Sequence, residues 1–137
     1  MNYPSTFLKG ISNPQDVVDG IVSAVPFRFD PKDPKQIRGL KLLQSIDWED
    51  DNGVIPLLMN QTNQKGDIQF KAGLARVPIS CVDYINSLPK LGGLDYEREV
   101  QPNNPYHGNL IIGIGANKPQ RDIISNMLAG HAEFIPR

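Results

Sequence analysis

Apolar side chains first recur at helical spacing between residues 14 and 25. Val17, Ile21 and Val25 follow one another at intervals of four, which places them on one face of a helix. The Asn-Pro pair before them is typical of an N-cap followed by the first helical residue, where the missing N–H of proline does no harm. The pattern therefore predicts a helix over residues 14–25.

Two further long segments have apolar residues at helical spacing. In residues 34–45 the pattern contains Gly39, and a glycine costs about 1 kcal/mol in a helix interior. Residues 119–129 have the strongest pattern, and Gly130 behind them is a common helix stop. A short helix is also expected from Ser80 onward. The chain is therefore predicted to contain three longer helices and one short one.

Strands are predicted where apolar and polar residues alternate, or where a short apolar run lies between turn residues. The strongest strand pattern covers residues 109–114. Three more segments are expected to complete the sheet, namely residues 54–59, 68–72 and 74–79. Shorter extended segments are expected at residues 1–12, 27–29 and 133–135.

These elements predict a single α+β domain that spans residues 1–137. Its sheet is expected to be mixed or antiparallel, with about four strands covered by the three longer helices. The length suits one domain, and 39% hydrophobic residues with a net charge of −1 exclude intrinsic disorder. Residues 89–106 are predicted to form a long irregular segment, and loops of that length are usually functional or mobile.

Charge and composition narrow the class of protein further. The nearly neutral net charge argues against binding nucleic acid through an overall positive field. No apolar stretch approaches the ~20 residues that a membrane span needs, and the first residues do not resemble a secretory signal. The single cysteine, Cys81, permits no internal disulfide. We therefore expect a cytoplasmic protein without a membrane partner.

The two histidines are the most informative candidates for catalysis. His107 precedes the strongest predicted strand, and His131 follows the strongest predicted helix. If the helix folds back along the strand, both imidazoles reach the same end of the domain. Such a pair can act as general base and general acid, with Glu133 alongside, and can cleave RNA without a metal. The alternative is that the helix dipole alone favours a histidine at position 131.

A glycine-rich turn joins the same strand and helix. Gly113 and Gly115, followed by Lys118 and Arg121, can hold a phosphate through backbone amides and positive charge. The dinucleotide-binding fingerprint lacks its third glycine here, and the Gly-Lys-Ser/Thr ending of the P-loop is absent. A tight turn without a ligand is the simpler interpretation.

Cys81 lies at a predicted helix start, where the helix dipole can lower the pKa of a thiol. Together with a histidine and Asp83 it can form a hydrolase site. A buried structural cysteine is the simpler alternative.

An acidic segment contains four carboxylates at Asp47, Glu49, Asp50 and Asp51. Counted from the first of them, the positions at which a calcium-binding EF-hand needs glycine and glutamate hold Asn52 and Leu58. The segment is therefore interpreted as a solvated turn, and neither a metal nor a cofactor is expected.

The long segment 89–106 suits contact with another protein, because tyrosine and arginine are enriched in interface hot spots. Its candidate contact residues are Tyr96, Arg98 and Tyr106. No specific catalytic motif is present, which favours a non-enzymatic protein-binding or accessory subunit of the adaptor, immunity or assembly type. The alternatives are a metal-independent nuclease or hydrolase that uses the two histidines and, more weakly, a phosphate-binding module.

Overall fold

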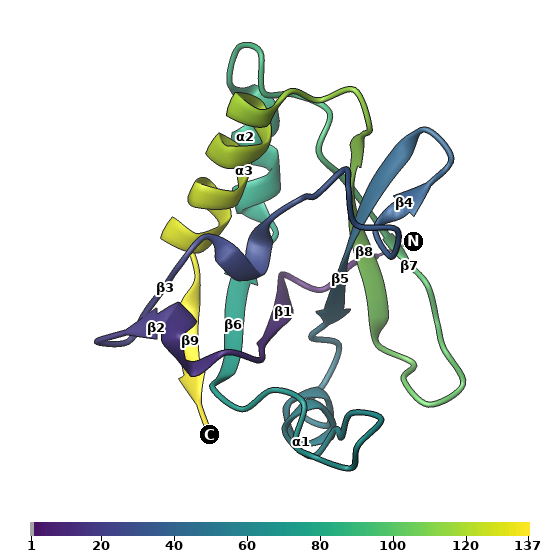
Figure 1. Cartoon of the computed structure of the whole chain (residues 1–137), viewed down its shortest axis with the longest axis vertical. Helices are drawn as coiled ribbons and strands as arrows, with labels where there is room; N and C mark the ends of the chain where they lie inside the picture. Colours follow the sequence, from purple (N-terminus) through teal and green to yellow (C-terminus); the bar gives the residue numbers. More distant parts are fainter. Residues whose placement is uncertain (1) are drawn as a thin grey trace.

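A seven-stranded antiparallel sheet runs through the computed structural model, which describes residues 2–137 (Figure 1). The strands follow the order β7-β8-β5-β1-β6-β9, and β4 pairs with the beginning of β5. Their bounds are β1 (Thr6–Ile11), β4 (Ile37–Arg38), β5 (Lys41–Trp48), β6 (Gly73–Pro78), β7 (Asp95–Arg98), β8 (His107–Gly113) and β9 (Glu133–Pro136). The predicted α+β class is confirmed, but the sheet has seven strands where about four were predicted.

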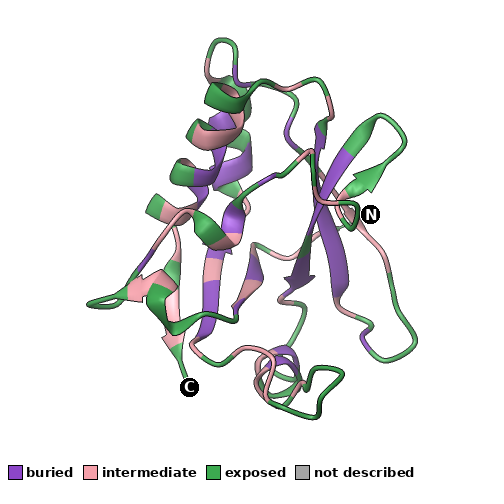
Figure 2. Cartoon of the chain, in the orientation of Figure 1, coloured by how far each residue is buried: buried purple, intermediate pink, exposed green. Residues whose placement is uncertain are grey.

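Both faces of the sheet are covered by packed side chains. Neighbouring residues of a strand point to opposite faces, so β1 contributes to the packing on both sides. Phe7 of β1 belongs to the larger core cluster, with side chains of α2 (Ser80–Ser87) and α3 (Lys118–Gly130). Leu8, the next residue, packs in a smaller cluster with α1 (Val54–Met59). Figure 2 shows the buried residues concentrated in the sheet strands and on the inner faces of α2 and α3.

The elements with the clearest end signals are where the sequence predicts them. The N-cap residue of α3 is Asn117, whose side chain accepts a hydrogen bond from the Gln120 N–H while the Gln120 side chain accepts one from the Asn117 N–H. This capping box satisfies two backbone donors at the helix start. The predicted strands 74–79, 109–114 and 133–135 and the helix from Ser80 are likewise confirmed as β6, β8, β9 and α2.

The predicted helix over residues 14–25 is wrong, and a hairpin takes its place. Only its start is helical, as the 3-10 turn η1 (Pro14–Asp16), capped by the Asn13 side chain. The chain then forms β2 (Val17–Val18) and β3 (Ile21–Val22), which pair around a two-residue turn. Asp19 and Gly20 both have positive φ, 52° and 77°. An Asp-Gly turn between β-branched residues favours this hairpin over a helix.

The predicted helix over residues 34–45 is also wrong. This segment contains β4 and the first part of β5, joined by a turn in which Gly39 has φ of 61°. All residues of β5 except Lys41 and Ser45 are buried, and Leu42, Ile46 and Trp48, which share one face of the strand, join the larger core. The positive φ that glycine allows and a period-two core face together outweigh the helical spacing.

The apolar run at residues 54–59 is the helix α1 and not a strand. Pro56 lies in its first turn, where no N–H is required, and Val54 and Leu58 point to the core four residues apart. The predicted strand 68–72 is replaced by irregular chain with one isolated bridge, between Thr62 and Ile68. Phe70 covers Gly10, where a Cβ would lie 2.1 Å from its ring.

Two more local predictions need correction. Residues 27–29 form no strand, because Phe27 ends the 3-10 turn η2 (Val25–Phe27), although both Phe27 and Phe29 are buried as their alternation suggested. The segment 89–106 is not wholly irregular, since it contains β7, which pairs with β8. No helix in the described residues is long and apolar enough to cross a bilayer.

Candidate functional site

The structure does not bring the predicted catalytic residues His107 and Glu133 together. Both belong to one cross-strand row of the sheet, which consists of His107, Asp47, Leu8, Arg76 and Glu133. Three strands separate the two residues, so their backbones lie about 19 Å apart at the usual strand spacing of about 4.8 Å. Glu133 instead pairs with the neighbouring Arg76 at 3.2 Å.

His131 lies on the opposite side of the sheet from His107. Its ring centroid is 6.2 Å from that of Tyr84 on α2, and its Nδ1 lies 2.9 Å from the carbonyl oxygen of Met127. α2 and α3 cover the face of the sheet that His107 does not share. The two imidazoles therefore do not face a common substrate, as a base and acid pair requires.

His107 is held in a polar network. It is buried, and its Nε2 lies 3.7 Å from Oε1 of Glu99. Asp47, opposite it on β5, accepts a hydrogen bond of 2.6 Å from the side chain of Asn104, and Asn109 donates to Glu99 at 3.3 Å. The network satisfies polar groups on the sheet face and leaves His107 little exposed surface.

The glycine-rich turn before α3 offers few free amides for a phosphate. The Ala116 N–H donates to the carbonyl of Gly113, and the Asn117 and Gln120 amides belong to the capping box. Pro119 has no N–H. Phosphate sites at helix starts depend on these donors, so the turn lacks most of what the predicted site needs.

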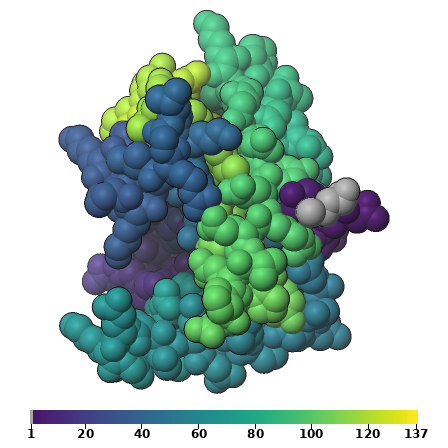
Figure 3. Space-filling view, turned by 90° about the vertical axis from the view of Figure 1, so that its right-hand side faces the viewer, coloured from purple at the N-terminus to yellow at the C-terminus, as the bar shows by residue number. Residues whose placement is uncertain are grey.

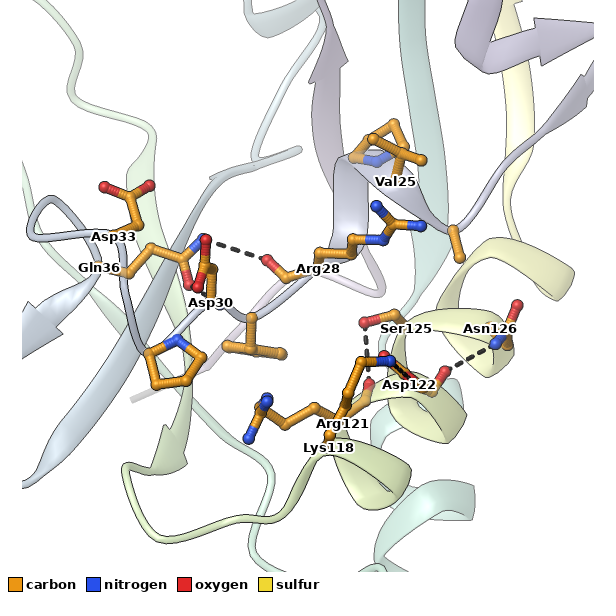
Figure 4. Close-up of a pocket in the computed structure, with 14 residues that line it drawn as sticks. Val25, Arg28, Asp30, Asp33, Gln36, Lys118, Arg121, Asp122, Ser125 and Asn126 are labelled. Atoms are coloured by element: carbon orange, nitrogen blue, oxygen red, sulfur yellow. Dashed lines mark hydrogen bonds and ion pairs between the residues drawn. The ribbon is translucent and has the colours of Figure 1, made fainter.

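Lys118 and Arg121 line a cavity of about 660 Å³ between the start of α3 and residues 24–36 (Figure 4). Arg28 contributes a third cation on the other wall, and three carboxylates balance the charge, namely Asp30, Asp33 and Asp122. Lys118 pairs with Asp122, and Arg121 donates to the carbonyl of Ala116 at 2.6 Å. Gly113 and Gly115 do not belong to the lining residues. This cavity is electrically balanced, which weakens it as an anion site.

Cys81 is buried between α2 and α3, with its Sγ 3.8 Å from the carbonyl oxygen of Met127. Burial raises the pKa of the thiol to about 11. A thiol that stays protonated in this way is a poor nucleophile, so the geometry matches a structural cysteine.

Tyr96 and Arg98 meet in an aromatic cluster, while Tyr106 lies elsewhere. The ring of Tyr96 is 5.5 Å from that of Trp48, and the guanidinium of Arg98 lies 6.0 Å from the Trp48 ring. Arg98 also forms an ion pair with Asp50. The side chains of Tyr96 and Arg98 therefore make these contacts within the molecule.

The acidic segment clamps distant parts of the chain to one another. Glu49 accepts two hydrogen bonds of 2.7 Å from Arg76, and Asp51 accepts one of 3.0 Å from the hydroxyl of Tyr106. Its carboxylates thus meet cations or hydroxyls of β6, β7 and the segment before β8. In residues 2–137, no three His, Cys, Asp or Glu side chains gather in a way that could hold a metal ion.

The sheet splits between β1 and β4, and sequence reasoning missed the cleft that results. β1 pairs with β5 only through Phe7 and Leu8, and β4 pairs with the other end of β5. Ser45 lies exposed on β5 between them. Lys9 reaches across the gap and donates a hydrogen bond of 2.7 Å to the carbonyl of Ser45.

The cleft at this split has a volume of about 350 Å³, within the range of small-ligand sites. Figure 3 shows this side of the molecule hollowed between the blue segment around residues 30–40 and the teal segment below it. Ten residues line the cleft, namely Lys9, Gly10, Ser12, Asn13, Asp16, Pro26, Ser45, Asp47, Gln69 and Phe70.

Two titratable groups of the cleft are shifted from their ordinary behaviour. Burial lowers the pKa of the Lys9 ammonium to about 8, and the negative charge of Asp47 partly offsets this. Burial raises the pKa of the Asp47 carboxyl, although its hydrogen bond from Asn104 acts in the opposite direction. Shifts of this kind in a cleft are a recognised mark of a functional site. The signal in the sequence was a lysine between Phe7 and Ile11, at an inward position of a strand.

The β2–β3 hairpin presents the second surface that sequence reasoning missed. Val18 and Ile21 lie directly opposite each other and are 65% and 72% exposed. Their neighbours Val17 and Val22 belong to the other face of the hairpin, which packs on the core. Leu40, in the turn before β5, and Val100, after β7, are also strongly exposed aliphatic residues, at 82% and 66%.

Comparison with models of protein families, with curated protein sequences and with solved structures gives no match to this chain.

Proposed function

We propose that this chain is a protein-binding or accessory subunit whose contact surface is the outer face of the β2–β3 hairpin. The observation that carries the proposal is the facing pair Val18 and Ile21, both more than half exposed. Single exposed apolar residues are ordinary, and two exposed β-branched side chains that face each other on one side of a hairpin support a contact surface better than either alone.

The hairpin is pre-organised for contact. Its inner face is anchored, because Val22 is buried in the main core and Val17 packs against it. The Ser23 N–H donates to the carbonyl of Asp16 at 2.8 Å, which closes the base of the hairpin. An element that is already ordered loses little conformational entropy on binding.

The surroundings of the pair indicate what the partner offers. Asp16 precedes the hairpin and Asp19 lies in its turn, so both ends of the hairpin carry a carboxylate. Burying both apolar side chains contributes roughly 3 kcal/mol or more, which is less than association costs. We therefore expect an apolar pocket with a basic rim on a partner protein, within a larger interface.

Site-specific photocrosslinking tests this proposal. A photoreactive amino acid at position 21 is expected to give one discrete adduct with a partner protein in cells that express the chain naturally. The same residue at position 40 serves as the matched control, because Leu40 is also an exposed aliphatic residue of a hairpin. Equal adducts from both positions, or none from position 21, would contradict the proposal. An adduct with a second copy of the chain would show that the hairpin mediates self-association and does not bind a different protein.

The other two function classes receive less support from the geometry. The nuclease hypothesis needs two converging imidazoles, and His107 and His131 occupy opposite sides of the sheet. The phosphate hypothesis needs free amides at the start of α3, and the capping box occupies two of them.

A further inference from the structure

The amine of Lys9 has a position that the proposed function does not use. It belongs to a half-buried side chain that lines the split-sheet cleft, and it donates a hydrogen bond to a backbone carbonyl. Within the described residues no carboxylate approaches its nitrogen within ion-pair distance, although other lysine and arginine groups have such partners. The charged groups that line the cleft besides Lys9 are Asp16 of η1 and Asp47 of β5.

We propose that the Lys9 amine binds a small hydroxylated aldehyde in this cleft as a covalent imine. The nitrogen lone pair attacks the carbonyl carbon and gives a carbinolamine. The hydroxyl group then leaves as water with a proton from the Asp47 carboxyl, which lines the same cleft, and a protonated imine and the Asp47 carboxylate remain. One amine and one aldehyde give one imine and one water, and nothing is oxidised or reduced.

The protonation states support this chemistry. An amine attacks only in its neutral form, and a lysine with a pKa of about 8 is partly neutral at physiological pH. Burial raises the pKa of Asp47, so this carboxyl keeps its proton to a higher pH than an exposed one does.

The lining residues indicate the class of aldehyde. Hydroxyl and amide groups come from Ser12, Ser45, Asn13 and Gln69, and they match the hydroxyl groups of a ligand. The ring of Phe70 offers an apolar wall. Because two carboxylates line the cleft against one amine, an uncharged hydroxyaldehyde fits better than a carboxylated one.

Reductive trapping tests the proposal on the wild-type chain. The protein is incubated with glycolaldehyde and cyanoborohydride at pH 7.5, and labelled lysines are identified by peptide mass mapping. Lys9 is expected to react at least about tenfold faster than the exposed Lys65, because its lower pKa leaves far more neutral amine. The comparison uses two lysines of one folded molecule, so it does not depend on a variant that folds.

Two results would overturn the inference. Labelling of Lys9 no faster than that of Lys65 would show that the amine only bridges the strands. Equal labelling of Lys9 by glyoxylate, a carboxylated aldehyde of the same size, would reject the uncharged ligand class. A Lys9→Arg variant is expected to lose the fast-reacting site and to keep the slow labelling of the other lysines. Neither result bears on the hairpin, so the two proposals fail separately.

Discussion

At the residue scale, Gly108 of β8 shows how tightly the strands pack around Trp48. A Cβ at this position would lie 2.2 Å from Nε1 of Trp48 and 2.4 Å from the carbonyl oxygen of Glu97. These two atoms form a hydrogen bond of 3.1 Å, in which the indole N–H is the donor. Any side chain at position 108 therefore disturbs both the packing and this bond.

We expect Gly108→Ala to lower the free energy of unfolding by about 2–4 kcal/mol, since the backbone carbonyl cannot move aside cheaply. Gly113→Ala on the same strand is the control, because a Cβ there would have no atom within 4 Å, and a change within about 0.5 kcal/mol is expected. Denaturant unfolding measures both variants. Equal stabilities would show that β8 does not pack against Trp48 as described.

At the element scale, the β2–β3 hairpin depends on a turn with positive φ at both central residues. Gly20, with φ of 77°, is the residue where a branched side chain is most strained. Asp19, with φ of 52°, can be replaced by asparagine, which tolerates this conformation well.

We expect Gly20→Val to open the hairpin, so that the Ser23 amide exchanges at least about fivefold faster, as 1–2 kcal/mol of strain implies. Asp19→Asn is expected to leave this exchange rate within about twofold. Hydrogen exchange read by NMR separates the two variants. Unchanged protection of Ser23 in Gly20→Val would contradict a hairpin with this turn.

Whether an element could be predicted from the sequence depends on the residues at its ends. α3 and β8 were predictable because a capping residue and an apolar run agree with the final packing. Residues 14–25 and 34–45 carry helical spacing, yet their turn glycines and the long-range pairing of β5 decide the outcome. Pairing between distant strands leaves no local trace in the sequence, so strand number was underestimated.

The absence of a local signal for strand pairing also explains why the sequence did not reveal where the candidate site residues lie. Both histidines were expected at one end of the domain on the assumption that α3 folds back onto β8. The strand order instead puts β5, β1 and β6 between β8, which contains His107, and β9, which contains Glu133. The cleft at Lys9 depends on where β1 stops pairing with β5, which sequence spacing does not reveal. An inward lysine in an apolar strand was the only local sign of it.

At the scale of the whole molecule, the acidic segment ties the sheet together. Glu49 accepts hydrogen bonds from Arg76 and Thr6, which lie on β6 and β1 (Figure 1). The hydrogen bond from Arg76 is the largest cause of the lowered pKa of Glu49, and both partners are largely shielded from water.

A group whose pKa is lower in the folded state stabilises the fold above its unfolded pKa and loses that contribution as the pH falls. We expect Glu49→Gln to lower the free energy of unfolding by about 1–2 kcal/mol at pH 7. The difference from wild type is expected to shrink as the pH falls below about 4.5, the ordinary pKa of glutamate. Unfolding curves between pH 3 and 7 measure it, and a pH-independent difference would rule out a charged clamp.

The proposed contact through Val18 and Ile21 predicts that this chain is part of a larger complex in the cell. The most direct test is the native size of the tagged chain in the cells that express it, compared among wild type, Ile21→Asp and Leu40→Asp. Wild type and Leu40→Asp are expected in a complex larger than the free chain, and Ile21→Asp at the size of the free chain. If wild type migrates as the free chain, or if Ile21→Asp stays in the complex, the hairpin is not the contact surface.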